Sequence, residues 1–391
     1  MGGEHSSFGA HPLAVVGGRL CTGLVDVTSD LAALERAGFW AVVLPFDSPP
    51  VCARFASVRP SPLWPGPQWL GPPADAWDTS LDRVSFEHGV ESIRSSIAAG
   101  DVYQVNLTRV LSAPLTDDPA RHGESSTSTS ADVAALGAAL AAGNPAPFSA
   151  VVRLPEQGVH VASASPERFL ARRGPIVWSS PIKGTASTPQ GFLDKDRAEN
   201  VMIVDLVRND LGRVCEWGTV TVPALLAVEQ HPGLFHLVST VKGHMRSAVG
   251  WPELIDATFP PGSVTGAPKV AALDHIRRLE PVPRGLYCGA IGWVDADRQM
   301  GDLNVAIRTF WIDEGRLHFG TGGGITYGST PEGEWSETEL KAHHLLSIAS
   351  STNEAPLPSR THAATGPRAQ LKKRSWWSPG AEPRTRRSAI R

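Results

Sequence analysis

The sequence predicts an α+β fold built on antiparallel sheets. Segments with the composition of strands come in runs, at 148–178 and again at 286–320, and segments with helical periodicity separate these runs. A doubly wound parallel sheet would instead show strands and helices in regular alternation. The chain has 391 residues, of which 41% are hydrophobic, enough for one large domain or two intertwined ones.

The first part of the chain predicts one clear helix. Residues 1–80 mix short apolar runs, such as AVVLPF at 41–46, with a Pro and Gly rich stretch at 60–73 that predicts a loop. From Ser85, a plausible N-cap, apolar residues recur at helical spacing until Gly100 ends the pattern. We therefore expect an amphipathic helix here.

The remaining elements follow from composition and periodicity. Strands are expected at 101–111 and 218–223, and two or three more within 148–178, with turns at 156–158 and 172–174. Ser125–Ser130 predicts a surface loop. Further helices are expected at about 131–142, 194–210, Pro268–Leu279 and 334–350, and further strands at 286–295, 303–312 and 316–320. From about Thr352 the composition predicts a disordered basic tail, either a solvated extension or a contact for nucleic acid or acidic proteins.

Bulk properties exclude several classes of protein. Lys and Arg number 36 against 39 Asp and Glu, so net charge gives no general reason to expect nucleic acid or a membrane surface as the partner. The four cysteines are far apart and form no CxxC pair, which favours a reducing, cytoplasmic setting over a disulfide framework. No stretch of eighteen apolar residues occurs, so a membrane span is not expected.

Lys183, in the segment PIKGT at 181–185, is the residue whose chemistry most needs an explanation. A solvated lysine has a pKa near ~10.4 and is almost wholly protonated at neutral pH. It can act as a nucleophile only where burial or neighbouring positive charge lowers that value. Its surroundings therefore decide its role.

Two pairs of acids have the spacing of neighbours on a helix face. Asp196 and Glu199 are three residues apart, and Glu334 and Glu337 repeat the spacing. Either pair alone is common on an exposed N-terminal turn. If the two helices face each other, the four carboxylates offer the hard oxygen ligands that suit Mg²⁺.

Candidates for anion recognition lie elsewhere. The loop FPPGSVTGAPK at 259–269 leads into a helix and presents free backbone amides, and TGGGI at 321–325 adds bare backbone. Arg308, flanked by apolar residues on an expected strand, either pairs with an internal acid or holds a ligand carboxylate. His236 is either a satisfied core histidine or a catalyst, and Glu167 is either paired with a nearby arginine or free to act.

Eleven blocks, taken in order over roughly residues 85–350, resemble the chorismate-utilising enzymes, the family of anthranilate, aminodeoxychorismate, isochorismate and salicylate synthases. The blocks are DVYQVNLT, NPAPFSA, SASPERFL, PIKGT, KDRAENVMIVDLVRNDLGRV, HLVSTVKG, FPPGSVTGAPK, GAIGW, IRT, TGGGI and EWSETELK. The resemblance implies large antiparallel sheets forming a sandwich core, with helices packed outside. It also implies a diverged N-terminal part of the same fold at 1–80, a chorismate-binding core at 81–351 and a tail at 352–391.

The resemblance implies a role for each candidate residue. Mg²⁺ would be held by Glu199, Glu334 and Glu337, with Asp196 matching the more variable fourth acid. The remaining site residues would bind the two ends of chorismate, and these are Arg308, Tyr287, Gly322 and Gly323 at the enolpyruvyl carboxylate, and Lys341, Thr265 and Gly266 at the ring carboxylate. Glu167 matches the general acid, and His236 would orient the leaving hydroxyl.

The branch of the family is indicated by two positions. The lysine of PIKGT resembles the mark of the aminodeoxychorismate branch, whereas the anthranilate branch usually carries a small residue there. Gln104 stands where members that use water carry a lysine, so ammonia is the expected nucleophile. Lys183 would attack C2, and ammonia would then add at C4 to give 4-amino-4-deoxychorismate, a precursor of 4-aminobenzoate.

The sequence contains no glutaminase nucleophile motif. The resemblance implies that a separate glutamine amidotransferase subunit supplies the ammonia. Two alternatives stay open at this point. The first is an anthranilate synthase component I, which also eliminates pyruvate. The second is a catalytically inactive relative that acts as a scaffold, although every central candidate residue is present.

Overall fold

A computed structural model describes residues 11–61, 68–115, 132–186, 188–231 and 234–350. The chain divides into two units, Met1–Thr352 and Asn353–Arg391, and all described residues belong to the first. The predicted basic tail and the predicted Ser125–Ser130 loop lie outside the described residues. None of the helices in the described ranges combines the length and apolar composition that crossing a bilayer requires.

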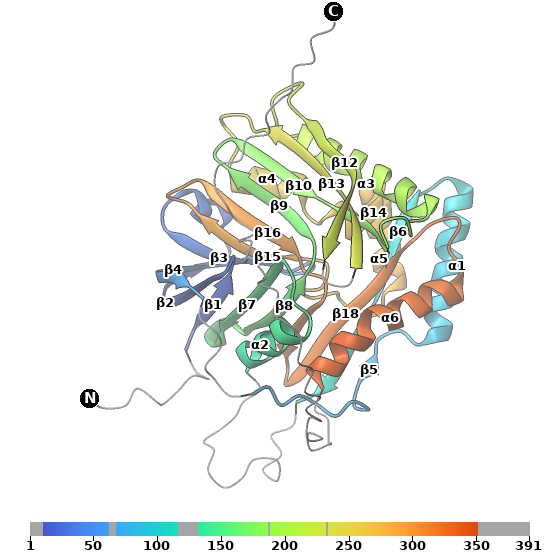
Figure 1. The fold of residues 1–391 in the computed structure, drawn as a ribbon, viewed down its shortest axis with the longest axis horizontal. Coiled ribbons are helices and arrows are strands. Elements are labelled where there is room, and N and C mark those ends of the chain that lie inside the picture. The colour runs from blue at the N-terminus through green and yellow to red at the C-terminus, as the bar shows by residue number, and fades with distance from the viewer. Residues whose placement is uncertain (1–10, 62–67, 116–131, 187, 232–233, 351–391) are drawn as a thin grey trace, which may run out of the picture. The chain divides into compact units, whose positions relative to one another are not determined.

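The described residues form eighteen strands that pair antiparallel into one large sheet (Figure 1). The strands are β1 (Leu13–Val16), β2 (Arg19–Thr28), β3 (Phe39–Leu44), β4 (Val51–Pro60), β5 (Asp78–Thr79), β6 (Gln104–Pro114), β7 (Phe148–Leu154), β8 (Val159–Ser165), β9 (Arg168–Arg173), β10 (Ile176–Ser180), β11 (Ile182–Ala186), β12 (Thr221–His231), β13 (Leu234–His244), β14 (Gly266–Ala267), β15 (Ala290–Asp295), β16 (Met300–Val305), β17 (Thr309–Asp313) and β18 (Arg316–Ile325).

The pairings lead along the sheet in the order β5, β6, β18, β17, β8, β7, β1, β2, β4, β3, β15, β16, β9, β10, β13 and β12. Strand β14 adds to β6 and strand β11 adds to β13. Strands from both ends of the chain are therefore neighbours, as where β3 pairs with β15.

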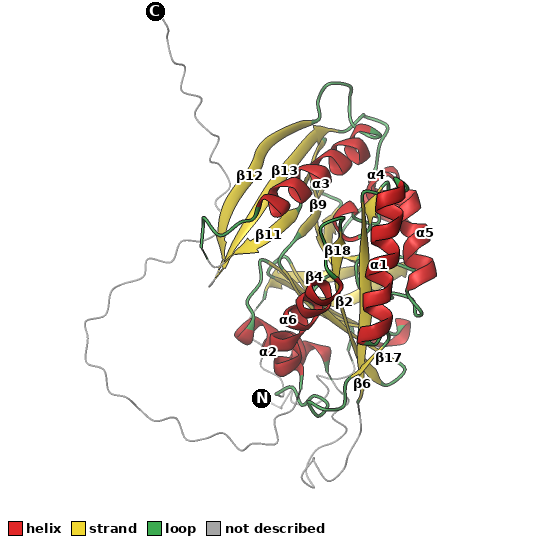
Figure 2. Ribbon diagram, turned by 90° about the vertical axis from the view of Figure 1, so that its right-hand side faces the viewer, coloured by secondary structure: helices red, strands yellow, loops and turns green. Residues whose placement is uncertain are grey.

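Six α-helices flank this sheet within the described ranges. They are α1 (Arg83–Ala99), α2 (Val133–Gly143), α3 (Asp194–Gly212), α4 (Trp251–Thr258), α5 (Lys269–Leu279) and α6 (Pro331–Ala349). Figure 2 shows α1 and α5 beside each other at one side of the sheet, and residues of both share an apolar cluster with β6. Short 3-10 turns occur at Leu31–Glu35, Pro155–Gln157 and Gly262–Val264.

The sheet folds back on itself and forms the predicted sandwich. Every residue of β3 is buried, and alternate residues face different clusters. Phe39, Ala41 and Val43 pack with β1 and β7, on the inside of the sandwich. Trp40 and Val42 face the opposite way and pack with residues of α3 and α4. The continuous apolar run of this strand is thus explained by burial on both faces.

Several predicted boundaries were wrong. Helix α1 begins earlier, because Asp82 is the N-cap and its carboxylate accepts a hydrogen bond of 2.8 Å from the Ser85 backbone N–H. Residues 148–180 form four strands, where two or three were expected. Strand β13 and helix α4 were not predicted, and the expected strand 303–312 is broken at Arg308, whose φ is 51°.

Candidate active site

Lys183 is the second residue of β11. The ladder between β11 and β13 shifts register between Ile182 and Thr185, and Gly184 has a φ of 88°. Such a bulge changes the direction in which the local side chains point. A Cβ on Gly184 would come within 2.8 Å of Asp196, so the bulge packs against the first turn of α3.

The Lys183 ammonium group lies beside Gln104 and the third glycine of TGGGI. A Cβ built on Gly324 would stand 3.4 Å from Lys183 Nζ and 1.8 Å from Gln104 Nε2. Gln104 is 1% exposed, and its side-chain oxygen is buried without a hydrogen-bond partner among the described residues. A buried amide oxygen of this kind is costly unless something donates to it, so it is suited to accept a hydrogen bond from a ligand.

Glu167 follows β8, and hydrogen bonds to Val305 fix the backbone at this point. The Ser165 hydroxyl donates to Val305 O at 2.6 Å, and Val305 N–H donates to Glu167 O at 3.0 Å. Burial raises the pKa of Glu167 to about 7, while hydrogen bonds from Ser263 and Ile182 and the charges of Lys183 and Lys341 act in the opposite direction. Burial thus favours the protonated form that a general acid needs.

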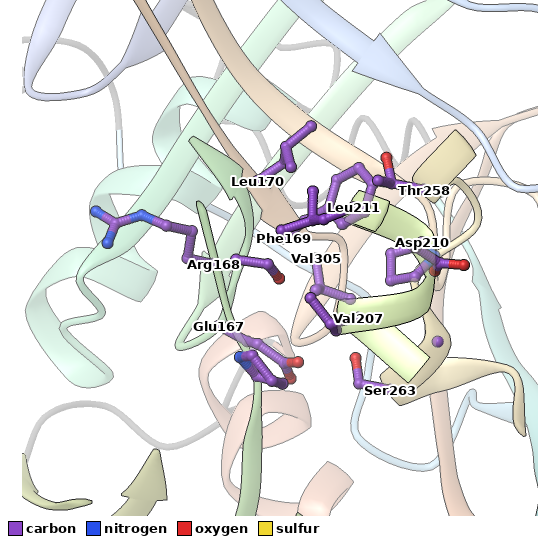
Figure 3. Close-up of a pocket in the computed structure, with 14 residues that line it drawn as sticks. Glu167, Arg168, Phe169, Leu170, Val207, Asp210, Leu211, Thr258, Ser263 and Val305 are labelled. Carbon is purple, nitrogen blue, oxygen red and sulfur yellow. The ribbon is translucent and has the colours of Figure 1, made fainter. Parts of the chain in front are cut away.

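Glu167 and Ser263 lie at the same end of a small cavity (Figure 3). The cavity has a volume of about 20 Å³, which accommodates one water molecule. Its lining also includes Val207 and Asp210 of α3. The carboxylate of Asp210 is paired with Lys269 at 2.8 Å, so it does not neutralise Lys183.

Two of the predicted acids, Glu199 of α3 and Glu334 of α6, lie close to the same lysine, Lys195. Glu334 is 4% exposed and accepts a hydrogen bond of 2.5 Å from the Ser329 hydroxyl. Lys195 Nζ lies 3.4 Å from Glu334 Oε1 and 3.6 Å from Glu199 Oε1. The same Glu199 oxygen has no hydrogen-bond partner among the described residues. Burial raises the pKa of Glu199, and the neighbouring Glu334 adds to that rise.

The position of α3 is fixed by Asn200, which is fully buried. Its side-chain amide donates to Leu237 O of β13 at 2.9 Å, and its oxygen accepts from Ser239 at 2.5 Å. This anchor is one residue from Glu199, so it sets the position of the carboxylate relative to β11 and β13.

Glu337 and Lys341 form an ion pair of 2.6 Å on α6, and Lys341 Nζ also donates to Gly322 O at 2.9 Å. Desolvation favours the neutral form of Glu337, but Lys341, Lys195 and Lys183 together outweigh it and lower the pKa overall. The carboxylate therefore stays ionised. Gly323 packs against the Glu334 carboxylate, because a Cβ at this position would lie 2.8 Å from Glu334 Oε2.

Asp196 has a structural task that the sequence did not reveal. Its carboxylate accepts a hydrogen bond of 2.8 Å from the Leu193 N–H at the start of α3. The described residues contain no group of three or more His, Cys, Asp or Glu side chains arranged to hold a metal ion. The assignment of the four acids to a metal therefore stays a prediction. The Glu199 oxygen that accepts no hydrogen bond from a described residue and the other hard carboxylate donors fit Mg²⁺ in kind.

Arg308 resolves one alternative left open above. Its guanidinium forms no ion pair with a described residue, and burial lowers its pKa. Its backbone oxygen accepts a hydrogen bond of 3.0 Å from the Ala164 N–H, which places Arg308 beside β8, the strand that leads to Glu167. A half-buried, unpaired guanidinium fits a ligand carboxylate better than an internal acid.

The remaining candidate residues are all buried in the fold. Tyr287 is 5% exposed, and its ring covers Gly320, where a Cβ would approach within 2.0 Å. Thr265 is fully buried, and Gly266 in β14 lies against Gln104, so that a Cβ would stand 2.1 Å from Gln104 O. His236 is 3% exposed on β13 and is the register partner of Thr185 in β11.

Three residues of the site escaped the sequence reasoning. Lys195, Ser263 and Gly324 all stand inside the blocks that were singled out, next to residues that were chosen. The signal available for Gly324 was the third glycine of TGGGI, directly after Gly322 and Gly323. No pattern marked Lys195 as a partner of acids on another helix, because that contact joins residues 139 positions apart.

Comparison with known proteins places these features in a family. Residues 64–347 match the chorismate binding enzymes. The chain is 39% identical over 283 residues to aminodeoxychorismate synthase component 1 of Klebsiella aerogenes, covering 69% of this chain and 59% of that protein. It is 38% identical over 293 residues to anthranilate synthase component 1 of Streptomyces coelicolor, covering 70% and 54%. The chain thus spans a little over half the length of the curated relatives it matches.

Solved structures share the fold. Anthranilate synthase component I from Streptococcus pneumoniae superposes with a TM-score of 0.67 at 24% identity, covering 88% of this chain and 95% of that chain. The menaquinone-specific isochorismate synthase from Escherichia coli gives 0.69 at 18% identity, covering 87% and 89%. The predicted architecture, large antiparallel sheets with helices outside, is confirmed.

Proposed function

The chain belongs to the family of chorismate binding enzymes, and from that premise we propose that it converts chorismate and ammonia to 4-amino-4-deoxychorismate. The observation that carries the proposal is Lys183. Its ammonium acts on the pKa values of Glu167, Glu199 and Glu337, so it lies within electrostatic reach of all three acids. A lysine at this position is the feature that distinguishes the aminodeoxychorismate branch by resemblance.

The substrate would be held at both carboxylates. Arg308 supplies an unpaired guanidinium for the enolpyruvyl carboxylate, and by resemblance the backbone of Gly322 and Gly323 and the ring of Tyr287 would assist it. Mg²⁺, when bound by Glu199, Glu334 and Glu337, would neutralise and orient the ring carboxylate, beside Lys341, which pairs with Glu337. By resemblance the backbone at Thr265 and Gly266 would assist. Fixing both ends of a dianion places the ring without further contacts.

In the proposed chemistry, the neutral Lys183 amine forms a bond to C2 of the ring while the double bond shifts and the C4 hydroxyl departs. Glu167 gives its proton to that hydroxyl, which leaves as water. Ammonia then bonds to C4 as the C2–lysine bond breaks, and the proton lost from the new ammonium group returns to Glu167. His236, opposite the Lys183 bulge, would orient the departing hydroxyl.

Gln104 supports ammonia as the incoming nucleophile. Its side-chain oxygen has no hydrogen-bond partner among the described residues, and the amide group that carries this oxygen lies against Gly324, as does Lys183 Nζ. An amide oxygen accepts hydrogen bonds from ammonia but cannot remove a proton from water as an amine can. The residue therefore favours amination over hydration.

Ammonia would be supplied by a separate glutamine amidotransferase. All four cysteines are buried, and burial raises the thiol pKa to about 12 in Cys21, Cys52 and Cys288 and to about 11 in Cys215. Such thiols are poor nucleophiles at neutral pH, so none suits the hydrolysis of glutamine.

The test is product identification by mass. The purified chain is incubated with chorismate, MgCl₂ and ammonium chloride, and we expect 4-amino-4-deoxychorismate with its enolpyruvyl group intact. Anthranilate and an equal amount of pyruvate would show the anthranilate reaction instead. Absence of turnover with intact chorismate binding would favour the inactive scaffold. Glutamine in place of ammonium should give no product without the partner.

A further inference from the structure

Lys195 connects two buried carboxylates that belong to different helices. It stands in the first turn of α3, and its ammonium lies 3.4 Å from Glu334 of α6 and 3.6 Å from Glu199 of α3. The Glu334 side chain is 4% exposed and that of Glu199 is 14% exposed. Both carboxylates are thus directed at one cation.

The lysine is the mobile member of this group. Its side chain is 41% exposed, whereas Glu334 is fixed by the hydrogen bond from Ser329 and Glu199 by the adjacent anchor at Asn200. A long side chain with an exposed end can move its ammonium group into water at little cost in packing. The two carboxylates cannot move apart in the same way, and like charges in a poorly solvated site repel each other.

We propose that Lys195 is an internal counter-cation that competes with the divalent metal for Glu199 and Glu334. The inference rests on the proposed function, which assigns these two glutamates to the metal. A cation that binds both carboxylates must occupy the space between them, where the ammonium lies. Metal binding is then an exchange of one cation for another.

This exchange has two consequences. Before metal binds, the ammonium neutralises the acid pair and keeps α3 and α6 in position. When metal binds, the apparent affinity is reduced by the fraction of molecules in which the ammonium holds the carboxylates. Lys195 therefore sets the metal concentration at which the site fills, without touching the substrate.

The test is Lys195→Met, which keeps most of the side chain's bulk and removes its charge. We expect Mg²⁺ to bind this variant at least threefold more tightly than wild type, and on the order of tenfold. The readout is isothermal titration calorimetry of the full chain with MgCl₂ alone, which does not depend on turnover. Thermal unfolding in EDTA and in saturating MgCl₂ provides a second readout, in which the variant should show the larger stabilisation by Mg²⁺.

Two controls accompany this variant. Arg197→Met removes one positive charge from the same helix at an exposed residue that forms no ion pair with a described residue, and its Mg²⁺ affinity should equal that of wild type. Lys195→Arg keeps the charge and should bind Mg²⁺ like wild type. Both controls separate competition at the carboxylates from a general change in charge.

Each outcome decides the proposal. Equal or weaker Mg²⁺ binding by Lys195→Met, with normal binding by wild type, overturns it and leaves the proposed function intact. Tighter binding by both Met variants to the same extent also overturns it, because the effect would then be general electrostatics. If wild type itself binds no Mg²⁺, the proposal fails together with the metal assignment.

Discussion

Gly324→Ala is the perturbation whose effect is most directly defined by the structure. The added Cβ would stand 1.8 Å from Gln104 Nε2, whereas ordinary contact begins at 3.4 Å, so the amide must withdraw by about 1.6 Å (3.4 minus 1.8). Lys183 Nζ, at 3.4 Å from the same Cβ, is touched without being displaced. Gln104 is 1% exposed and has no solvent space into which to move.

The expected loss follows from this displacement. A misplacement of about 1 Å at a reacting centre costs on the order of 100-fold in rate. We therefore expect kcat/KM for chorismate to fall about 100-fold or more, which corresponds to about 2.7 kcal/mol of transition-state stabilisation. The loss should appear in kcat, because Arg308 and the other carboxylate contacts are unchanged. Overpacking should also lower the free energy of unfolding by about 1–3 kcal/mol.

The assay is steady-state formation of the aminated product at saturating ammonium, with chorismate varied. Gly328→Ala is the matched control, because a Cβ there meets no heavy atom within 4 Å. It should keep the kcat and melting temperature of wild type. If folded Gly324→Ala works within about threefold of this control, Gln104 and Lys183 do not share the reacting space, and the reasoning is refuted.

Two further predictions concern the nucleophile and the acid. Lys183→Ala should reduce the ammonia reaction at least 1,000-fold while chorismate affinity, measured by calorimetry, changes less than about threefold, since the carboxylate contacts remain; turnover equal to wild type would exclude a covalent adduct. Because burial raises the pKa of Glu167 to about 7 and the acid must be protonated, kcat/KM should fall as the pH rises through about 7. Ser263→Ala removes a hydrogen bond that lowers this pKa, so the alkaline limb should move to higher pH, and a limb that stays in place or moves down would contradict the assignment of Glu167.

Local sequence patterns predicted which helices and strands occur better than they predicted the residues at which each one begins and ends. The apolar spacing from Phe86 to Ile97 identified α1, yet its start was misplaced because the choice between Asp82 and Ser85 depends on which side chain accepts the backbone hydrogen bond. Strand β13 was missed although HLVSTVKG has the composition of a strand. The break at Arg308 was invisible, because a positive φ at an arginine has no compositional signal.

The candidate site shows the same contrast between what the sequence predicted and what only the structure revealed. Blocks that resemble one family identified Lys183, Glu167 and Glu334, and the structure places their side chains in one electrostatic neighbourhood. The same reasoning matched Asp196 to the more variable fourth acid of the metal site, which stays a prediction, but did not foresee that its carboxylate also accepts a hydrogen bond at the start of α3. It also overlooked Lys195, because a charge that pairs across helices looks like an ordinary surface lysine in a sequence.

The amino-acid sequence by itself determined which chemical groups this protein has, its α+β class and its family. All three depend on residue type and on spacing over short stretches of the chain. Only the tertiary structure decided which groups face one another. Lys183 meets the acids because a bulge in β11 turns it, and Lys195 meets Glu334 because Asn200 fixes α3 against β13. Distances across the fold depend on packing between segments far apart in the chain, and no local pattern encodes them.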